Sequence, residues 1–299
     1  MSDFPLSGET IGSPFPPDAH LSDEPLDVCL SGEPLNAPAA PGDWVARDGL
    51  NARPGLRRVL LTLSYDGTAY AGWQRQQNAL AVQQVVEDAL FSLTGERIAV
   101  TGASRTDAGV HALGQRAHFD TASRIPADRF PYALNTCLPK DIRVLSGREV
   151  SGSFHARFDA RGKQYIYRIH NAPHASALYR HLTAHVPVAL NAPAMRRALP
   201  ALLGTHDFAA FQASGGTART TVRTLTMAEL THQGDELTLT VQGNAFLYNM
   251  VRMIAGTLIE IGKGKLGEDA FLRALMTGDR LALGPTAPAC GLVLTRVDY

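Results

Sequence analysis

The segment from Gly102 to Asp120, GASRTDAGVHALGQRAHFD, contains the residue of this chain that is best suited to chemistry, Asp107. Arg105 precedes this aspartate by two positions and Gly109 follows it by two, so a carboxylate sits in a glycine-edged turn beside a guanidinium. The unperturbed pKa of an aspartate is about 3.9, and a neighbouring positive charge lowers it further. We therefore expect Asp107 to be ionised at neutral pH, as a carboxylate nucleophile must be.

Both charged residues of this turn also have purely structural readings. An aspartate in a Thr-Asp-Ala-Gly sequence commonly accepts hydrogen bonds from nearby backbone amides. Arg105 serves as a charge partner, as a phosphate contact or as an exposed loop arginine, because many surface ion pairs contribute little to stability. The short motif by itself leaves these alternatives open.

Charge is divided unevenly along the 299 residues. Residues 1–55 hold nine acidic and two basic residues, a net charge of −7, together with half of the 18 prolines and no sustained apolar period. This composition predicts a disordered acidic, Pro-rich extension. The remaining 26 basic and 19 acidic residues give +7, which suits a polyanionic partner but is also compatible with a merely solvated basic surface.

The cysteines and histidines do not suggest a metal site. Cys29, Cys137 and Cys290 are far apart and form no C-x-x-C pattern, so neither a disulfide framework nor a zinc site is predicted. The histidines offer one weak metal-binding spacing, the His181/His185 pair. The sequence shows no signal peptide and no apolar run approaching the roughly 18 residues of a membrane span. We expect a cytoplasmic protein without a membrane partner.

Hydrophobic periodicity predicts the elements that must position the Asp107 turn. The run RRVLLTLSY predicts a strand over 57–65, and apolar residues at helical spacing predict a helix over 82–93 that ends at Gly95. A strand over 97–102 is expected to deliver the turn. The other elements of this half are predicted as a strand over 115–120, a helix over 127–135 and strands over 141–150 and 162–169.

The second half of the chain echoes this order. Its predicted elements are helices over 193–203, 246–261 and 268–276 and strands over 221–231, 237–241 and 292–297. The pattern predicts an α+β fold in which two ferredoxin-like-related halves share a mainly antiparallel central sheet with helices packed on it. We place the half that carries Asp107 at 56–170 and the half that completes the sheet and cleft at 171–299.

The Asp107 segment resembles the active-site signature RTDxGVH of the TruA-type tRNA pseudouridine synthases, and further motifs of that family follow in the same order. They are YDGTAYAGWQ at 65–74, FHARF at 154–158, KQYIY at 163–167, GTHDF at 204–208, NAFLYNMVR at 244–252 and GLVL at 291–294. The resemblance extends over 57–299 and does not cover the first 55 or so residues. Two positions depart from the family pattern: Arg116 follows Gln115 where an aliphatic residue is usual, and Asn249 stands where histidine is frequent.

The resemblance implies that Asp107 is the catalytic residue of a uridine-to-pseudouridine isomerisation. This reaction breaks the bond between base and ribose, rotates the freed uracil and rejoins it through C5, so the enzyme must stabilise or trap an electron-poor sugar. A carboxylate nucleophile divides such a displacement into easier steps. No group is lost and the redox state is unchanged, so we expect neither a cofactor nor a metal.

Tyr165 and Arg252 are the other catalytic residues that the resemblance implies. Tyr165 and Tyr167 share one face of their predicted strand. By resemblance, Tyr165 packs on the flipped target base and takes part in proton transfer from C5, whereas Tyr167 is expected to pack within the sheet. Arg252 lies one position off the apolar stripe of its helix, where a buried cation is costly without an anion. The resemblance supplies that anion as Asp107.

The predicted substrate-binding residues are Arg105, Arg116, Arg157, Tyr165 and Leu292. Leu292 matches a family position that lines the base pocket, although an apolar strand residue needs no such role. The arginines are interleaved with aromatic residues, which is typical of an RNA cleft, although most arginines on soluble proteins are only solvated.

These observations predict a tRNA-uridine isomerase that attacks through Asp107. By resemblance alone, its targets are positions 38, 39 and 40 in the anticodon arm of tRNA, and its working unit is a homodimer. One alternative is a catalytically silent tRNA-binding protein, which the intact Asp107, Tyr165 and Arg252 disfavour. Another is a carboxylate-dependent nucleoside hydrolase, which would normally need a second acid or a metal.

Overall fold

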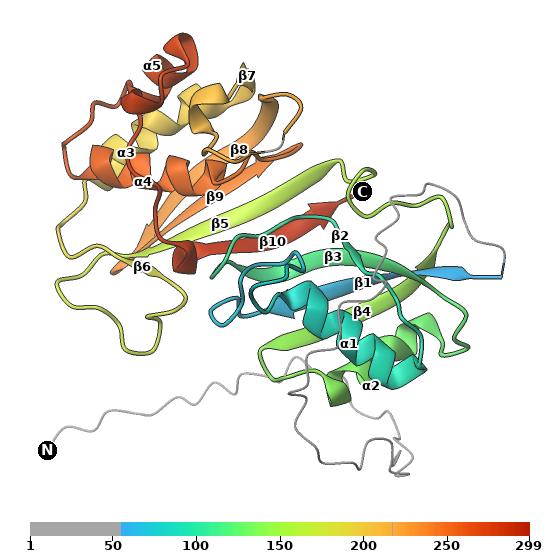
Figure 1. The fold of residues 1–299 in the computed structure, drawn as a ribbon. Coiled ribbons are helices and arrows are strands. Elements are labelled where there is room, and N and C mark those ends of the chain that lie inside the picture. The colour runs from blue at the N-terminus through green and yellow to red at the C-terminus, as the bar shows by residue number, and fades with distance from the viewer. Residues whose placement is uncertain (1–54, 217) are drawn as a thin grey trace, which may run out of the picture. The chain divides into compact units, whose positions relative to one another are not determined.

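The computed structural model describes residues 55–216 and 218–299, so the extension predicted over 1–55 lies outside the described residues apart from Gly55. The described strands are β1 (Arg57–Tyr65), β2 (Thr101–Gly102), β3 (His111–Thr121), β4 (Ile142–Val150), β5 (Gly162–His170), β6 (Ala184–His185), β7 (Gly204–Asp207), β8 (Val222–Gln233), β9 (Glu236–Gly243) and β10 (Leu292–Asp298). They form one sheet with the order β4-β1-β3-β10-β5-β9-β8-β7, in which β2 pairs with β3 and β6 with β5 (Figure 1). Neighbours are antiparallel except for β10 with β3 and β5 with β6.

Two groups of helices pack on different ends of this sheet (Figure 1). The helices are α1 (Val82–Thr94), α2 (Phe130–Cys137), α3 (Ala192–Ala198), α4 (Met250–Gly262) and α5 (Ala270–Thr277). Helix α2 packs on β4 and contacts α1, whereas α3 packs on β8 and contacts α4, which also touches β5. The predicted α+β class with a mainly antiparallel sheet is confirmed.

One row of paired residues shows that both helix groups cover the same face of the sheet. Tyr165 of β5 pairs with Val241 of β9 and with Leu294 of β10. Leu294 pairs in turn with Ala112 of β3, which pairs with Tyr65 of β1. Directly paired residues point to the same side of a sheet. All five side chains are buried, so this face carries the core and also presents Tyr165 between the two helix groups.

The strand predicted over 97–102 is shorter in the structure, where only Thr101–Gly102 pairs with β3. The prediction was wrong for 97–100, where side chains of α1 form hydrogen bonds with the backbone amide and carbonyl of Val100 in place of a neighbouring strand. The amide of Val100 donates to Glu87 Oε1 at 3.0 Å, and Gln83 Nε2 donates to the Val100 carbonyl at 3.0 Å.

The helix predicted over 246–261 begins later, at Met250. Asn249 directly before it has a φ of 61°, in the left-handed region that a right-handed helix cannot contain. Leu247 therefore lies outside the helix, although it is buried, as are Val251 and Ile254 of the predicted apolar stripe. The sequence pattern does not predict β6 and β7, because two and four residues are too few to show an alternation.

Candidate active site

Asp107 lies in the loop between β2 and β3, and the segment 65–74 holds this loop in place. The hydroxyl oxygens of Tyr65 and Thr106 are 2.8 Å apart, and the amide of Trp73 donates to the Thr106 carbonyl at 3.1 Å. Tyr65 and Trp73 are themselves buried in the core. Two motifs that are separated in the sequence therefore form one structural unit around the carboxylate.

Glycines allow the two segments to approach this closely. Gly72 has a φ of +87°, and a Cβ atom at this position would lie 2.4 Å from the Thr106 carbonyl oxygen. A Cβ atom on Gly67 would lie 2.0 Å from the Val110 carbonyl oxygen. Both separations are far below van der Waals contact, so any larger residue would displace the backbone that carries Asp107.

The carboxylate of Asp107 faces Arg252 of α4, with Arg252 Nη1 3.5 Å from Asp107 Oδ2. Two other acceptors hold the guanidinium: Nε donates to the Ala287 carbonyl at 2.8 Å, and Nη1 donates to Asn249 Oδ1 at 2.7 Å. The side chains of Arg252 and Asp107 are only 18% and 22% exposed. The cation is therefore anchored independently of the carboxylate, and the long ion pair leaves Asp107 able to reach a substrate.

Burial raises the pKa of Asp107 above its ordinary value, and the positive charge of Arg252 offsets only part of this effect. The expectation that the pKa of Asp107 lies below its ordinary value was wrong, because removal of the carboxylate from water has a larger effect than the neighbouring guanidinium. The ion-pair partner is Arg252, whereas Arg105 is exposed. A raised pKa makes the ionised carboxylate a stronger base and a better nucleophile than a free aspartate.

Tyr165 lies on the floor of the same site. Its phenolic oxygen is 2.7 Å from Ser104 Oγ, and its ring meets Phe246 edge-on with a centroid separation of 5.1 Å. Burial raises the pKa of Tyr165 to about 12, and the negative charge of Asp107 adds to the shift. The phenol is therefore protonated at neutral pH.

Gln115 holds the backbone of Ser104 through two hydrogen bonds. The Ser104 amide donates to Gln115 Oε1 at 3.2 Å, and Gln115 Nε2 donates to the Ser104 carbonyl at 2.7 Å. Gln115 is fully buried, and both ends of its amide are satisfied by one residue. The sequence analysis did not identify Ser104 or Gln115 as site residues, because β3 contains several other polar residues and Gln115 does not stand out among them.

An open cavity of about 860 Å³ contains both Asp107 and Tyr165. This volume is within the range of sites that take small organic ligands. Leu292, at the start of β10, lines the cavity as predicted, together with Val110, Phe246, Leu247 and Val251. The cavity thus combines one carboxylate, the phenols of Tyr165 and Tyr248 and an apolar wall that matches a nucleobase in size and chemistry.

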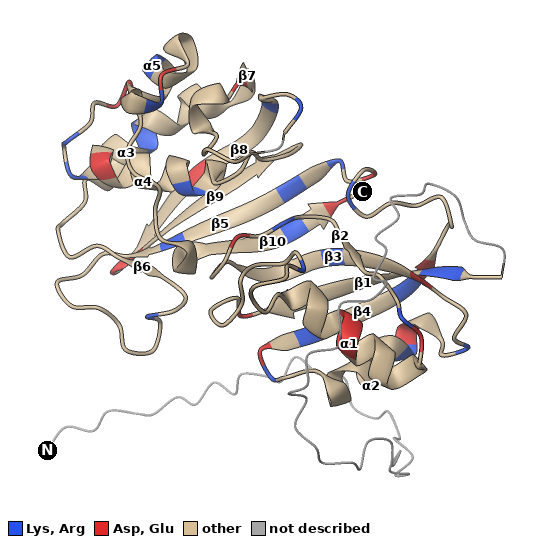
Figure 2. Ribbon diagram, viewed as in Figure 1, with Lys and Arg blue, Asp and Glu red and all other residues tan. Residues whose placement is uncertain are grey.

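Cationic side chains also line this cavity, among them Lys163 of β5, a strand on which Figure 2 marks basic positions. The basic lining residues are Arg105, Arg157, Lys163, Arg219 and Arg223. Asp107 is the only acidic residue among the described lining residues. Buried Arg223 Nε has no hydrogen-bond partner in the described chain. The uncompensated charge favours an anionic ligand.

Lys163 is the most enclosed of these cations. Its Nζ donates to the Ala103 carbonyl at 2.7 Å. Burial, together with the positive charges of Arg157 and Arg223, lowers the pKa of Lys163 to about 8. An anion bound here would therefore favour the protonated lysine.

Arg116 is not brought to this cavity. Its Nη1 donates to the hydroxyl of Thr62 on β1, and it is absent from the residues that line the site. The substrate contact predicted for Arg116 stays a prediction, whereas Arg105, Arg157, Tyr165 and Leu292 share one cavity wall.

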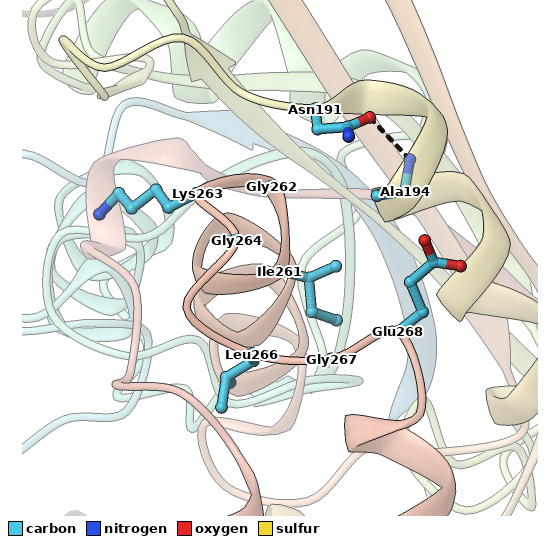
Figure 3. Close-up of a pocket in the computed structure, with 9 residues that line it drawn as sticks. All are labelled: Asn191, Ala194, Ile261, Gly262, Lys263, Gly264, Leu266, Gly267 and Glu268. Carbon is cyan, nitrogen blue, oxygen red and sulfur yellow. Dashed lines mark hydrogen bonds between the residues drawn. The ribbon is translucent and has the colours of Figure 1, made fainter.

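A second hollow lies where α4 ends and α3 begins (Figure 3). Its polar groups are already satisfied: Asn191 Oδ1 accepts from the Ala194 amide at 3.1 Å, and Glu268 pairs with Arg197 at 2.6 Å. It contains no arrangement comparable to Asp107 and Tyr165, so we assign the chemistry to the larger cavity.

The described residues contain neither a cluster suited to a metal ion nor a helix suited to a membrane. Within 55–216 and 218–299, histidine, cysteine and acidic side chains do not gather in threes around a point that could hold a metal ion. In the same part of the chain, every helix is too short or too polar to cross a bilayer.

Most of the chain is similar to known proteins. A family model described as tRNA pseudouridine synthase matches residues 62–159 and 198–299. The chain belongs to this family. The tRNA pseudouridine synthase A of Ruminiclostridium cellulolyticum is 51% identical over 245 residues, which cover 82% of this chain and 100% of that protein. The corresponding proteins of Acetivibrio thermocellus and Halalkalibacterium halodurans are 50% and 46% identical, over 82% and 81% of this chain and 100% and 92% of their own lengths.

The predicted family is thereby confirmed. The two matched segments of this tRNA pseudouridine synthase family member contain the Asp107 loop and Arg252, which the fold brings within 3.5 Å of each other. Residues 160–197, between the matched segments, include Tyr165.

Proposed function

We propose that this protein isomerises uridine to pseudouridine in tRNA. The observation that carries the proposal is the Asp107 carboxylate, half-enclosed beside an anchored Arg252 and in one cavity with Tyr165. The named relatives are tRNA pseudouridine synthases A, which supports the choice of substrate.

Asp107 is the nucleophile of the proposed reaction. A covalent adduct with its carboxylate accompanies cleavage of the bond between uracil N1 and ribose C1′. The uracil then turns, and C5 bonds to C1′ as the bond between C1′ and the Asp107 carboxylate breaks, while C5 loses a proton and N1 gains one. Substrate and product are isomers, so the chemistry consumes no co-substrate.

The other site residues position the substrate and the carboxylate of Asp107. Arg252 keeps the carboxylate oriented and favours its ionised form. Leu292 and the Tyr165 ring provide apolar surface for a base that has left its stack. The Tyr165 oxygen can accept the C5 proton only if its own proton passes to an acceptor, and Ser104 Oγ at 2.7 Å is in place for this.

The basic side of the cavity is proposed to hold the tRNA backbone. Phosphate contacts by Lys and Arg supply affinity that falls steeply with salt, because each contact releases condensed counterions. Arg105, Arg157, Lys163 and Arg223 are in position for such contacts. Binding should accordingly weaken as the salt concentration rises, and a flat salt profile would contradict this assignment.

The finer parts of the proposal are the target positions and the working unit. We assign the activity to positions 38, 39 and 40 of the anticodon arm, in a cytoplasmic homodimer that binds RNA. The resemblance to tRNA pseudouridine synthases A supports these assignments, and the uncompensated cations of the cavity support the binding of RNA.

Carbodiimide mapping of tRNA, from cells with and without this protein, tests both the reaction and its position. Loss of the signal at 38–40 in the deletion strain, and its return with the wild-type gene but not with Asp107→Asn, is the expected result. Release of free uracil by the purified enzyme would instead support a nucleoside hydrolase. Tight tRNA binding without any pseudouridine would support a silent binding protein.

A further inference from the structure

Phe158 is an aromatic side chain that the proposed chemistry does not use. It lines the active-site cavity, yet its side chain is 63% exposed. Tyr165 and Leu292, which are buried in the same cavity, already offer the target base an apolar surface. Phe158 therefore leaves much of its side chain exposed where it lines the cavity.

The Phe158 ring is held in place from behind by His155. The two rings are stacked with a centroid separation of 4.2 Å and an interplanar angle of 27°. His155 Nδ1 accepts hydrogen bonds from the amides of Arg157 and Phe158 at 3.1 and 3.2 Å. His118, which is buried, contacts the other side of His155 at 5.0 Å. The exposed ring thus rests on a fixed support, which reduces the entropy lost when a ligand stacks on it.

One cation lies over this ring, and two others line the same cavity. The guanidinium of Arg157 lies 5.8 Å from the centre of the Phe158 ring, and Lys163 and Arg223 line the same cavity. An aromatic face beside uncompensated cations is the combination by which proteins hold single-stranded nucleic acid, with a base on the ring and its phosphate on the cations.

We propose that Phe158 is a stacking platform for a nucleobase of the bound tRNA that neighbours the flipped uridine. The proposal rests on the proposed function, because it names how the same cavity holds the RNA next to the target. Phe158 is a positioning residue here: it keeps the strand open while the target base occupies the pocket of Asp107 and Tyr165.

Tyr132 offers a matched control. It is 71% exposed, and the guanidinium of Arg129 lies 5.8 Å from its ring centre, as Arg157 does from Phe158. Tyr132 does not line the cavity. The two aromatic residues therefore share exposure and a cationic neighbour, and differ in their distance from the site.

The first experiment measures tRNA affinity in an Asp107→Asn background, which separates binding from turnover. Stacking of one base contributes about 1–3 kcal/mol, or roughly 5- to 150-fold in affinity. Phe158→Ala should weaken binding within this range, Phe158→Trp should retain it, and Tyr132→Ala should leave it unchanged. Equal affinities for Phe158→Ala and the parent would overturn the proposal, as would full affinity in Phe158→Leu, which keeps the apolar volume without the ring.

The second experiment reports the stacked base itself. An anticodon stem-loop carries 2-aminopurine directly 5′ or 3′ of the target uridine, and stacking on an aromatic ring quenches its fluorescence. We expect quenching at one of these two positions that is lost in Phe158→Ala but kept in Tyr132→Ala. Quenching that is the same in all variants would overturn the proposal. Pseudouridine formation by the wild-type enzyme is scored separately, so failure of the platform and failure of the proposed reaction give different results.

Discussion

The phenolic oxygen of Tyr165 and the hydroxyl oxygen of Ser104 lie 2.7 Å apart, inside the cavity that also contains Asp107. Because Gln115 binds the backbone of Ser104 on both sides, this hydroxyl is a fixed partner for the phenol. The pKa of Tyr165 is raised to about 12 by burial, so the phenol carries its proton at neutral pH. Its part in proton transfer therefore depends on Ser104.

Removal of either hydroxyl should slow the chemical step. Tyr165→Phe is expected to lower kcat by about 10²–10⁴, the usual contribution of a positioned proton-transfer group, with tRNA affinity little changed. Ser104→Ala removes the acceptor for the phenolic proton and should lower kcat by more than the roughly 2- to 10-fold of one net hydrogen bond, about 0.5–1.5 kcal/mol, and at most as far as Tyr165→Phe. Single-turnover kinetics with tRNA measures both effects.

Tyr167→Phe is the control for this pair. Tyr167 shares the strand face of Tyr165, but its hydroxyl donates to the Pro288 carbonyl at 2.8 Å and lies outside the cavity lining. Its single-turnover rate should match the wild type. Wild-type rates in Tyr165→Phe would remove the phenol from the mechanism.

Replacement of Arg252 should shift the pH dependence of the reaction upward. The positive charge of Arg252 lowers the pKa of Asp107 against the larger effect of burial, so Arg252→Gln raises this pKa further. Since the proposed nucleophile is the ionised carboxylate, the acid limb of the kcat/KM profile should move to higher pH. Arg252→Lys, which keeps the charge, should move it less. An unchanged or lowered acid limb in Arg252→Gln would contradict the assigned coupling.

Lys163 should link tRNA binding to proton uptake. The pKa of Lys163 is lowered to about 8, and a bound phosphate favours the charged form, so affinity should fall as the pH rises from about 7 to about 9. Lys163→Arg should remove this dependence because arginine stays charged, and Lys163→Met should bind weakly throughout. Filter binding of tRNA to Asp107→Asn at constant ionic strength gives the measurement. The same pH slope in wild type and Lys163→Arg would exclude Lys163 as its source.

The same lysine makes a separate contribution to stability. Its folded pKa lies below its ordinary value of 10.5, so between about pH 8 and that value the unfolded chain binds more protons than the folded one. From this group alone, the free energy of unfolding therefore rises with pH over that window.

Gly72→Ala should damage the active site more than it damages the fold. Gly72 has a φ of +87° and leaves no room for a Cβ atom beside Thr106. Gly95 also has a positive φ, +70°, but a Cβ atom there would meet no atom within 4 Å. Both substitutions carry a left-handed strain of about 1–2 kcal/mol, and only Gly72→Ala also displaces the Asp107 loop. We expect activity to be lost in Gly72→Ala and kept in Gly95→Ala, while thermal melting shows both proteins folded.

Local patterns in the sequence predict the regular elements and the main site residues. The strand of Tyr65 and the helix that ends at Gly95 agree closely with β1 and α1, because both rest on a clear apolar period and a turn signal. Asp107, Tyr165 and Arg252 are recognisable because each lies in a long motif.

The contacts between distant segments could not be predicted from the sequence. The pKa of Asp107 depends mainly on burial by residues that are distant in the sequence. A prediction from the neighbouring Arg105 therefore gave the wrong direction for the shift of this pKa. The prediction of a strand over 97–100 was wrong, since Gln83 and Glu87 of α1 bind the backbone of Val100. Only the folded chain shows that Ser104 meets Tyr165.

The position of β10 has a consequence for how the molecule is made. This strand is translated after every other described strand, yet it lies in the middle of the sheet, parallel to β3 and antiparallel to β5. A nascent chain that has not yet released β10 from the ribosome lacks the link between the two sets of strands, as well as Leu292 in the cavity wall. Catalytic competence therefore arises only once β10 has joined the sheet, and a chain without this strand cannot engage its RNA productively.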